Sequence, residues 1–419
     1  MHRVLPFHRL LGASGASNLA DGALLTVMPL VALSITRSPG AFATVTLFGR
    51  LPWLVVALPA GALNDRLDRR RTMLRVNLAR VGLIGTLALV VAGGNQELWM
   101  LYVVAFALGV GETFYDTAAQ SIVPSLVGDS VPLERVNSRL YAVELTANQF
   151  VGPALGGLIA GLALTAGLSA SAAAYLVAAL VLTSIAGNFR PAPPAIPARL
   201  RTDIAEGVRY LAQHQLLRAL AICVGVSNLA STATFAVFPL YAIAPGPMGL
   251  DGAGFGLLLA AIAAGSVVGT FLVGPMVRRL GQRRALLVSM SASACFPLAP
   301  ALSDNAWIVG AGFAAAAAIS IGWNVITVSL RQRTVPDHLL ARVNAGYRLL
   351  AWGTMPIGAA LGGLIADLFG LTAVFWTSAA LGALCLPIIL SQVTTARLAA
   401  AEAGGGDSAV SSSRRRAAR

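Results

Sequence analysis

The sequence predicts an all-α polytopic membrane protein in which twelve transmembrane helices form two six-helix bundles. Of the 419 residues, 57% are hydrophobic and only 11% are charged, whereas about a quarter of the residues in a soluble domain are charged. Apolar runs of roughly 20 residues, the length that crosses a bilayer, recur along the whole chain. The second half of the chain also repeats short motifs of the first half, as two similar bundles would require.

Twelve apolar runs are long enough to be membrane spans. They cover approximately residues 10–35, 41–63, 73–93, 98–122, 137–164, 168–189, 216–243, 253–276, 285–302, 307–330, 342–367 and 371–392. The first run, Leu10 to Ser34, is longer than the apolar part of a signal peptide and lacks a convincing cleavage site, so we expect it to be retained. Glycine and proline interrupt several spans, which membrane helices tolerate where neighbouring helices satisfy the backbone.

The net charge of +13 comes from arginine alone, because the chain contains no lysine. If the N-terminus is cytoplasmic, the arginine-rich loops all fall on the cytoplasmic side, and the outer loops hold only Arg37. This distribution predicts a multi-pass protein of the inner (plasma) membrane with both termini in the cytoplasm. Because the arginines lie in short loops between apolar spans, we expect contacts with membrane lipid and none with nucleic acid.

The chain divides into four predicted parts: an N-terminal bundle (1–190), a cytoplasmic linker (191–215), a C-terminal bundle (216–395) and a disordered tail (396–419). The linker begins with a proline-rich, extended stretch. Residues 199–215 then place apolar side chains at helical spacing opposite charged ones, which predicts an amphipathic helix on the inner membrane surface. The tail is rich in glycine and serine, a composition typical of disorder.

Two stretches recur at about half the chain length. The charged hinge Gly61–Thr72, between spans 2 and 3, has a weaker copy at Gly274–Arg284, and Leu155–Ala160 recurs as Leu361–Ala366. The dense charge of the hinge cannot lie in a bilayer, so we expect a polar loop on the cytoplasmic side. Internal repetition of this kind is typical of secondary transporters whose substrate site lies between two related bundles.

Twelve spans, two repeated halves and a Gly-x-x-x-Asp-Arg-x-x-Arg-Arg-Arg hinge resemble the major facilitator superfamily. The positions that resemble the signature loop of that superfamily are Gly61, Asp65, Arg66, Arg69, Arg70 and Arg71. The chain departs from the signature at Asp68, where the superfamily usually has glycine, and the copy has Arg278 in place of the acid. The resemblance implies the major facilitator fold and transport by alternating access.

A motif in span 5, formed by Gly152, Pro153, Gly156 and Gly157, resembles one that is characteristic of proton-coupled drug exporters. Together with Ala20–Gly22 and Ala205–His214, it resembles the subgroup that contains macrolide exporters and the enterobactin exporter, which implies proton antiport. The alternative is that the small residues only allow close helix packing. Many drug exporters also carry an arginine in span 4, but here Gly109–Asp116 contains two acids and no arginine.

Ionisable side chains inside a membrane are costly and are therefore functional candidates. Asp21 in span 1 and Glu112 in span 4 are the candidates for proton coupling, because a carboxylate in an apolar bundle can exchange a proton near neutral pH. The alternative for Asp21 is a helix-packing hydrogen bond or a permanent ion pair with Arg50. The candidate substrate-cavity residues are Arg50, Asp116, Arg348, Phe114, Tyr115, Phe235 and Trp323.

Each of these assignments competes with a structural role. Arg80, Asp116 and Glu144 lie toward the cytoplasmic half of their spans, where a structural ion-pair cluster is the alternative. Aromatic side chains in membrane helices pack against other helices or face lipid by default. Asp65 of the hinge is expected to act as a latch that pairs with arginine when the cytoplasmic side is closed. The alternative is a loop kept polar only to fix the topology.

The sequence therefore predicts a proton-coupled exporter of hydrophobic or amphipathic small molecules that works as a monomer, without a cofactor or metal ion. An exporter of an endogenous metabolite such as a siderophore, and a proton-coupled importer, are the alternatives. An enzyme is not expected, because no nucleophile–base pair or metal cluster stands out. An ATP-driven pump is not expected either, because a chain without lysine cannot supply the lysine of a P-loop.

Overall fold

The computed structural model describes residues 5–64, 66–127, 132–187, 189–190 and 200–398. Within these ranges the regular structure is helical, apart from an isolated β-bridge between Ile243 and Leu250. The predicted linker residues 191–199 and the tail from residue 399 onward lie outside the described residues.

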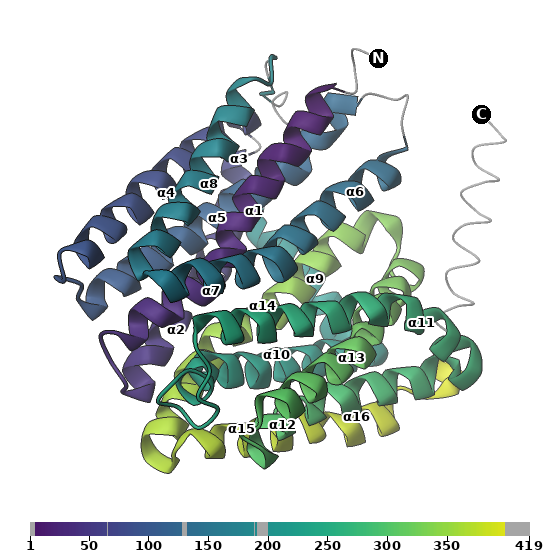
Figure 1. Cartoon of the computed structure of the whole chain (residues 1–419). Coiled ribbons are helices and arrows are strands. Elements are labelled where there is room, and N and C mark those ends of the chain that lie inside the picture. Colours follow the sequence, from purple (N-terminus) through teal and green to yellow (C-terminus); the bar gives the residue numbers. More distant parts are fainter. Residues whose placement is uncertain (1–4, 65, 128–131, 188, 191–199, 399–419) are drawn as a thin grey trace. The chain divides into compact units, whose positions relative to one another are not determined.

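The helices follow the order of the predicted spans (Figure 1). The first half contains α1 (Leu5–Leu33), α2 (Pro39–Val55), α3 (Ala57–Asn64), α4 (Arg69–Ala92), α5 (Leu98–Val127), α6 (Leu133–Leu145), the π-helical segment η2 (Thr146–Val151), α7 (Gly152–Leu162) and α8 (Leu164–Thr183). The second half contains α9 (Leu200–Gln213), α10 (Gln215–Ala242), α11 (Gly252–Cys295), α12 (Leu298–Leu302), α13 (Ala306–Thr334), α14 (Asp337–Phe369), α15 (Leu371–Ala383) and α16 (Cys385–Gln392).

Among the described residues, nine helical segments are long and apolar enough to cross a membrane. The remaining predicted spans are helical but interrupted or merged. The span predicted at 41–63 breaks at Val56 into α2 and α3, and the span predicted at 137–164 contains η2. α11 joins two predicted spans across Gly281, whose φ of 74° glycine adopts without steric cost. The all-α membrane architecture is thus confirmed, and the count of twelve spans is confirmed in part.

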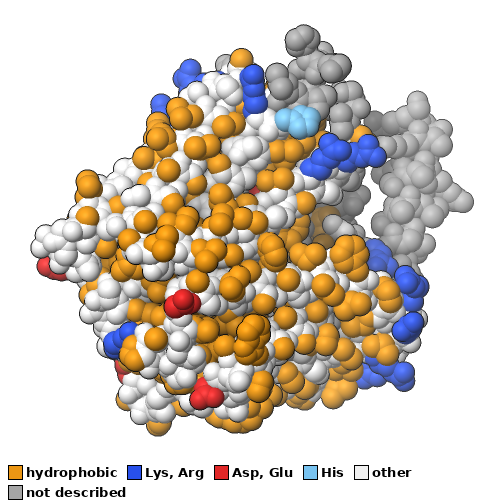
Figure 2. Space-filling view, viewed as in Figure 1, with side chains coloured by type: hydrophobic (Ala, Val, Ile, Leu, Met, Phe, Trp, Pro, Cys, Tyr) orange, Lys and Arg blue, Asp and Glu red, His pale blue; other side chains and the backbone are white. Residues whose placement is uncertain are grey.

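Large hydrophobic side chains are exposed on the outside of the helices. They spread across the face shown in Figure 2. Leu89 and Phe271 are each 76% exposed, and Trp307 is 87% exposed. A soluble monomer rarely exposes large contiguous apolar patches, so this surface fits contact with lipid.

The chain folds into two compact units. The first comprises Met1–Ala195, Phe235–Ala263 and Gly362–Leu371, and the second comprises Ile196–Thr234, Ala264–Leu361 and Thr372–Arg419. The predicted domain boundaries at residues 190, 215 and 395 follow the sequence repeat, and they stay predictions.

In the first unit, α1 packs along α8 and α7, while α4 packs against α8 and α5 (Figure 1). One hydrophobic core joins α1, α4, α5 and α8, and its buried side chains include Phe7, Met73, Tyr115, Ile122 and Leu182. Burial of these side chains fixes the relative positions of the four helices. The same helices carry the polar side chains of the candidate site.

The Gly152–Gly157 motif lets α7 approach α1 closely. A Cβ atom at Gly152 would lie 2.8 Å from the backbone of Gly22, and one at Gly156 would lie 2.5 Å from the carbonyl oxygen of Ala23. Thr26 on α1 also donates a 3.0 Å hydrogen bond to the carbonyl oxygen of Pro153 on α7. Small residues and interhelical hydrogen bonds of this kind bring membrane helices together, so the structure gives Gly152 and Gly156 a packing role.

In the second unit, α9 packs against the start of α14. Gly207 lies against the backbone of Arg342, whose guanidinium group is 2.5 Å from the carboxylate of Glu206. Leu211 and Val343 are buried in the hydrophobic cluster between these helices. The predicted helix of the linker is therefore present, whereas its place on the membrane surface stays a prediction.

We predict that Gly156→Ala destabilises the protein by about 1–3 kcal/mol, because the added methyl group forces α7 and α1 apart. A lower melting temperature of the purified protein in detergent would show the effect. Gly85→Ala in α4 is the matched control, because a Cβ atom there meets no heavy atom within 4 Å. The control variant is expected to be stabilised by up to about 1 kcal/mol, because alanine favours the helix more than glycine does. Equal melting temperatures of the Gly156→Ala and Gly85→Ala variants would contradict the packing role.

Candidate functional site

One face of α1 carries the polar side chains of Ser14, Ser17, Asn18 and Asp21. Their spacing of three or four residues places them on the same side of the helix. Ser14 and Ser17 are fully buried, and Asn18 is nearly so. Buried polar groups need hydrogen-bond partners, and for Ser17 and Asp21 the partners come from the neighbouring helices α4 and α8.

Asp21 contacts two helices at once. Its Oδ2 atom is 3.4 Å from Nη1 of Arg80 on α4, and its Oδ1 atom accepts a 2.7 Å hydrogen bond from the hydroxyl group of Tyr175 on α8. An ion pair of Asp21 with Arg50 was the alternative considered from the sequence, and the structure places Arg80 there instead. The carboxylate therefore ties three membrane-spanning helices together.

Arg80 is buried among α1, α5 and α8, with 2% of its side chain exposed. Its Nη1 atom lies 3.4 Å from Oγ of Ser17, and its Nη2 atom is 3.4 Å from the carbonyl oxygen of Leu108, to which it donates. The guanidinium carbon lies 5.1 Å from the ring centre of Tyr175 and 5.8 Å from that of Tyr115, within the range of cation–π attraction. The positive charge is thus held by one carboxylate and two aromatic rings.

A glycine of α5 makes room for this arginine. A Cβ atom at Gly111 would lie only 2.8 Å from Nε of Arg80. The span-4 arginine that many drug exporters carry is absent from this chain, and here a neighbouring span supplies a buried arginine that reaches the surface of α5. The glycine at position 111 and the arginine at position 80 therefore fit each other sterically.

Glu112 and Asp116 lie on α5 within electrostatic reach of Arg80. Glu112 also interacts with Arg50 and with the indole of Trp53. Asp116 lies within electrostatic reach of both Arg80 and Glu144, and the ion-pair cluster of these three residues stays a prediction. The carboxylate that forms the ion pair with Arg80 is that of Asp21 on α1.

The other predicted cavity residues are divided between the two units. In the first unit, Tyr115 is buried in the hydrophobic core and Phe235 packs edge-on against Phe238, with ring centres 6.2 Å apart. In the second unit, Trp323 is buried in another hydrophobic cluster, and the guanidinium group of Arg348 lies 4.3 Å from the ring centre of Trp352. The burial of Tyr115 and Trp323 fits the packing alternative, and Phe114 is half-buried on α5.

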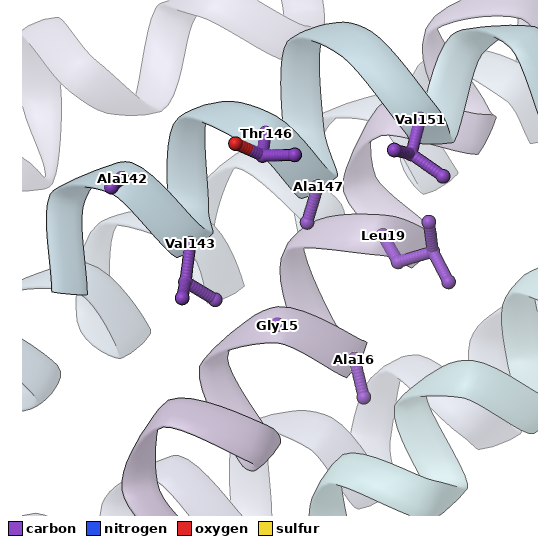
Figure 3. Close-up of a pocket in the computed structure, with 8 residues that line it drawn as sticks. All are labelled: Gly15, Ala16, Leu19, Ala142, Val143, Thr146, Ala147 and Val151. Atoms are coloured by element: carbon purple, nitrogen blue, oxygen red, sulfur yellow. The ribbon is translucent and has the colours of Figure 1, made fainter. Parts of the chain in front are cut away.

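A pocket of about 450 Å³ lies between α1 and the α6–η2 segment (Figure 3). Its lining is almost wholly apolar and consists of Gly15, Ala16, Leu19, Ala142, Val143, Thr146, Ala147 and Val151. Gly15, Ala16 and Leu19 lie on the side of α1 roughly opposite Ser17 and Asp21, because successive residues turn by 100° around a helix. The pocket is open on one side, so it offers a small hydrophobic ligand an apolar wall rather than an enclosed cavity.

The described hinge side chains hold the start of α4. Asp68 accepts a 2.9 Å hydrogen bond from the backbone N–H of Arg71, which caps the helix, and a 3.2 Å hydrogen bond from the backbone N–H of Phe189. Arg70 donates to a carbonyl oxygen just beyond α8. Asp68, the departure from the signature loop, therefore has a structural role. Asp65 lies outside the described residues, so the latch stays a prediction.

Sequence reasoning missed three residues of the site. Tyr175 lies in an alanine-rich span, where an aromatic side chain is normally a packing residue. Asn77 accepts a 3.2 Å hydrogen bond from Ser17, and neither residue is ionisable. Helical spacing is the signal that could have found Asn77 and Ser17. Asn77 is three residues from Arg80 on α4, and Ser17 is four residues from Asp21 on α1, so each polar residue shares a helix face with a charged one.

The sequence matches the family described as transmembrane secretion effector over residues 7–410. The chain belongs to this family of major facilitator transporters. A similar protein is the multidrug efflux pump Tap of Mycolicibacterium fortuitum, which is 28% identical over 416 residues that cover 94% of this chain and 95% of Tap. The enterobactin exporter EntS of Shigella boydii is 29% identical over 350 residues, which cover 80% of this chain and 76% of EntS.

Solved structures show the same fold for this secretion-effector transporter. The nucleoside transporter NupG superimposes with a TM-score of 0.71 at 10% identity, covering 93% of this chain and 99% of NupG. A bacterial homologue of the iron transporter ferroportin gives a TM-score of 0.68 at 18% identity, covering 93% and 97% of the two chains. At these identities the likeness concerns the fold alone. The predicted major facilitator fold is therefore confirmed.

We predict that Arg80→Met destabilises the transporter by about 3–5 kcal/mol, because it leaves the Asp21 carboxylate buried without its cation. Adding Asp21→Asn removes that uncompensated charge, so the double variant is expected to recover part of the loss. Melting temperatures of the two single variants and the double variant, measured in one detergent, give the coupling energy. Strictly additive losses would show that the two side chains do not interact.

Proposed function

We propose that this transporter exports hydrophobic or amphipathic small molecules in exchange for protons, and that Asp21 carries the exchanged proton. The observation that carries the proposal is the position of the Asp21 carboxylate, which lies in the middle of α1 and contacts Arg80 and Tyr175 on two other spans. An ionisable group at such a place in a membrane protein is a functional candidate by default. It also controls how α1 is attached to its neighbours.

The mechanism follows from the change in charge. When Asp21 is ionised, it attracts Arg80 and accepts the hydrogen bond of Tyr175, which holds α1 against α4 and α8. When Asp21 is protonated, the attraction to Arg80 is lost and α1 is free to shift relative to α4. Binding of a proton on one side of the membrane thus favours one of two helix arrangements, which is the requirement for alternating access.

The substrate class follows from the other side of α1. The pocket between α1 and η2 is apolar, and Thr146 supplies its hydroxyl group. A shift of α1 that follows protonation changes the shape of this pocket, so proton binding and substrate binding are coupled through one helix. The name of the relative Tap, a multidrug efflux pump, supports substrates of this class.

An exporter of an endogenous siderophore is the second candidate, because the relative EntS is named as an enterobactin exporter. The two candidates share the proton mechanism and differ in the ligand. The arginine distribution supports an inner-membrane location with cytoplasmic termini for both. Proteoliposomes that contain the purified protein distinguish them, because ethidium and enterobactin can be offered as alternative substrates under the same imposed pH gradient.

We predict that Asp21→Asn lowers pH-gradient-driven ethidium transport in these proteoliposomes at least about tenfold, which corresponds to about 1.4 kcal/mol in the rate-limiting barrier. Ethidium binding, measured by fluorescence without a gradient, is expected to persist. Asp304→Asn, in an exposed loop, is the charge-matched control. Transport by Asp21→Asn that still follows the pH gradient would assign Asp21 to helix packing, and Glu112→Gln would then be the next variant to measure.

A further inference from the structure

A basic groove of about 370 Å³ lies at one end of the first unit, where α4 begins and the chain leaves α8. Four arginines line it: Arg66, Arg71, Arg75 and Arg190. Its acidic side chain is Asp68. A groove of this size can hold a group as large as a phospholipid headgroup.

The described acid of the groove, Asp68, is held in place by the backbone around it. Both carboxylate oxygens of Asp68 accept hydrogen bonds from backbone N–H groups, one from Arg71 at 2.9 Å and one from Phe189 at 3.2 Å. Within the part of the chain that the structure describes, no carboxylate forms an ion pair with Arg66, Arg71 or Arg75. Among the described residues that line it, the groove therefore has an excess of positive charge, with four arginines and one aspartate.

The basic groove continues into a lipid-facing surface. Arg71, Arg75, Leu78 and Leu89 fall on one face of α4, because their spacing returns to the same side of the helix. Leu78 is 48% exposed and Leu89 is 76% exposed, on a helix that is long and apolar enough to cross a membrane. Arg71 and Arg75 belong to its first two turns, within about 9 Å of its start, and basic residues at the end of a membrane-spanning helix are typical of the headgroup region.

We propose that this groove binds one anionic phospholipid, whose phosphate contacts Arg66, Arg71 and Arg75 and whose acyl chains lie along Leu78 and Leu89. Guanidinium groups recognise phosphate oxygens through paired hydrogen bonds, so several arginines around one volume favour a phosphate ligand. The headgroup is anionic rather than zwitterionic, because the described lining holds four arginines against one aspartate, so a ligand with net negative charge is favoured. The bound lipid then holds the start of α4, the helix that carries Arg80.

The test uses the purified full chain in detergent and native mass spectrometry to count bound lipids. The probes are dioleoyl phosphatidylglycerol, dioleoyl phosphatidylethanolamine with the same acyl chains, and inorganic phosphate as the competitor. Phosphatidylglycerol is expected to bind more tightly than phosphatidylethanolamine, and inorganic phosphate is expected to displace neither. Equal binding of the two lipids would overturn the proposal, and displacement of phosphatidylglycerol by an equal concentration of phosphate would show a site for free phosphate instead.

The variants locate the site. Arg71→Gln combined with Arg75→Gln is expected to weaken phosphatidylglycerol binding about thirtyfold, if each arginine contributes what a basic residue near a membrane surface usually does. Arg135→Gln combined with Arg139→Gln removes the same charge from exposed positions on α6 and is expected to leave binding unchanged. Equal losses in the two double variants would overturn the groove as the site. Arg71→Lys combined with Arg75→Lys keeps the charge but not the paired hydrogen bonds, so it is expected to bind more tightly than the glutamine variant and more weakly than the unchanged protein. Binding no tighter than that of the glutamine variant would contradict the contribution of charge.

Discussion

The ion pair between Arg80 and Asp21 is the constraint on which the first unit depends. Moving an unpaired charge into an apolar bundle costs several kcal/mol or more, so each of these residues needs the opposite charge of the other. α1 and α4 both pack against α8, the ion pair links them to each other, and Tyr175 brings α8 to the same carboxylate. Gly111 and Ser17 are then the residues that let the guanidinium group fit.

α1 meets different environments on its two sides. Its polar side contacts α4 and α8 through Asp21. Its other side packs against η2 and α7 at Gly22, and nearer the N-terminus it lines the apolar pocket. A helix that is bonded tightly on every side could not move. The pocket leaves space beside α1 at Ala16 and Leu19, so a change in the charge of Asp21 has a direction in which α1 can respond.

The sequence predicted the helices better than it predicted their contacts. Hydrophobic runs and the arginine hinge are local signals, so the spans and the fold could be predicted, and Asp21 could be chosen because it is ionisable within a span. The partner of Asp21 could not be predicted, because the depth of a residue along a span does not tell which side of the helix faces which neighbour. Arg80 was therefore grouped with Asp116 and Glu144 at similar depth, and Tyr175 was not noticed. The pocket was missed because the π-helical turn before Pro153 has no local hydrophobic pattern.

The geometry of the pair also bears on how easily it can be broken. The contacts of Arg80 with Asp21, Ser17 and Leu108 are each 3.4 Å, longer than the roughly 2.7–2.9 Å of a strong charge-assisted hydrogen bond, whereas the tyrosine bond to Asp21 is 2.7 Å. Tyr175 can keep a hydrogen bond to the carboxyl group after Asp21 is protonated, because one oxygen still accepts. Protonation would therefore release α4 from α1 while α8 stays attached. We infer that the two partners have different roles, with Tyr175 orienting the carboxyl group in both states and Arg80 distinguishing between them.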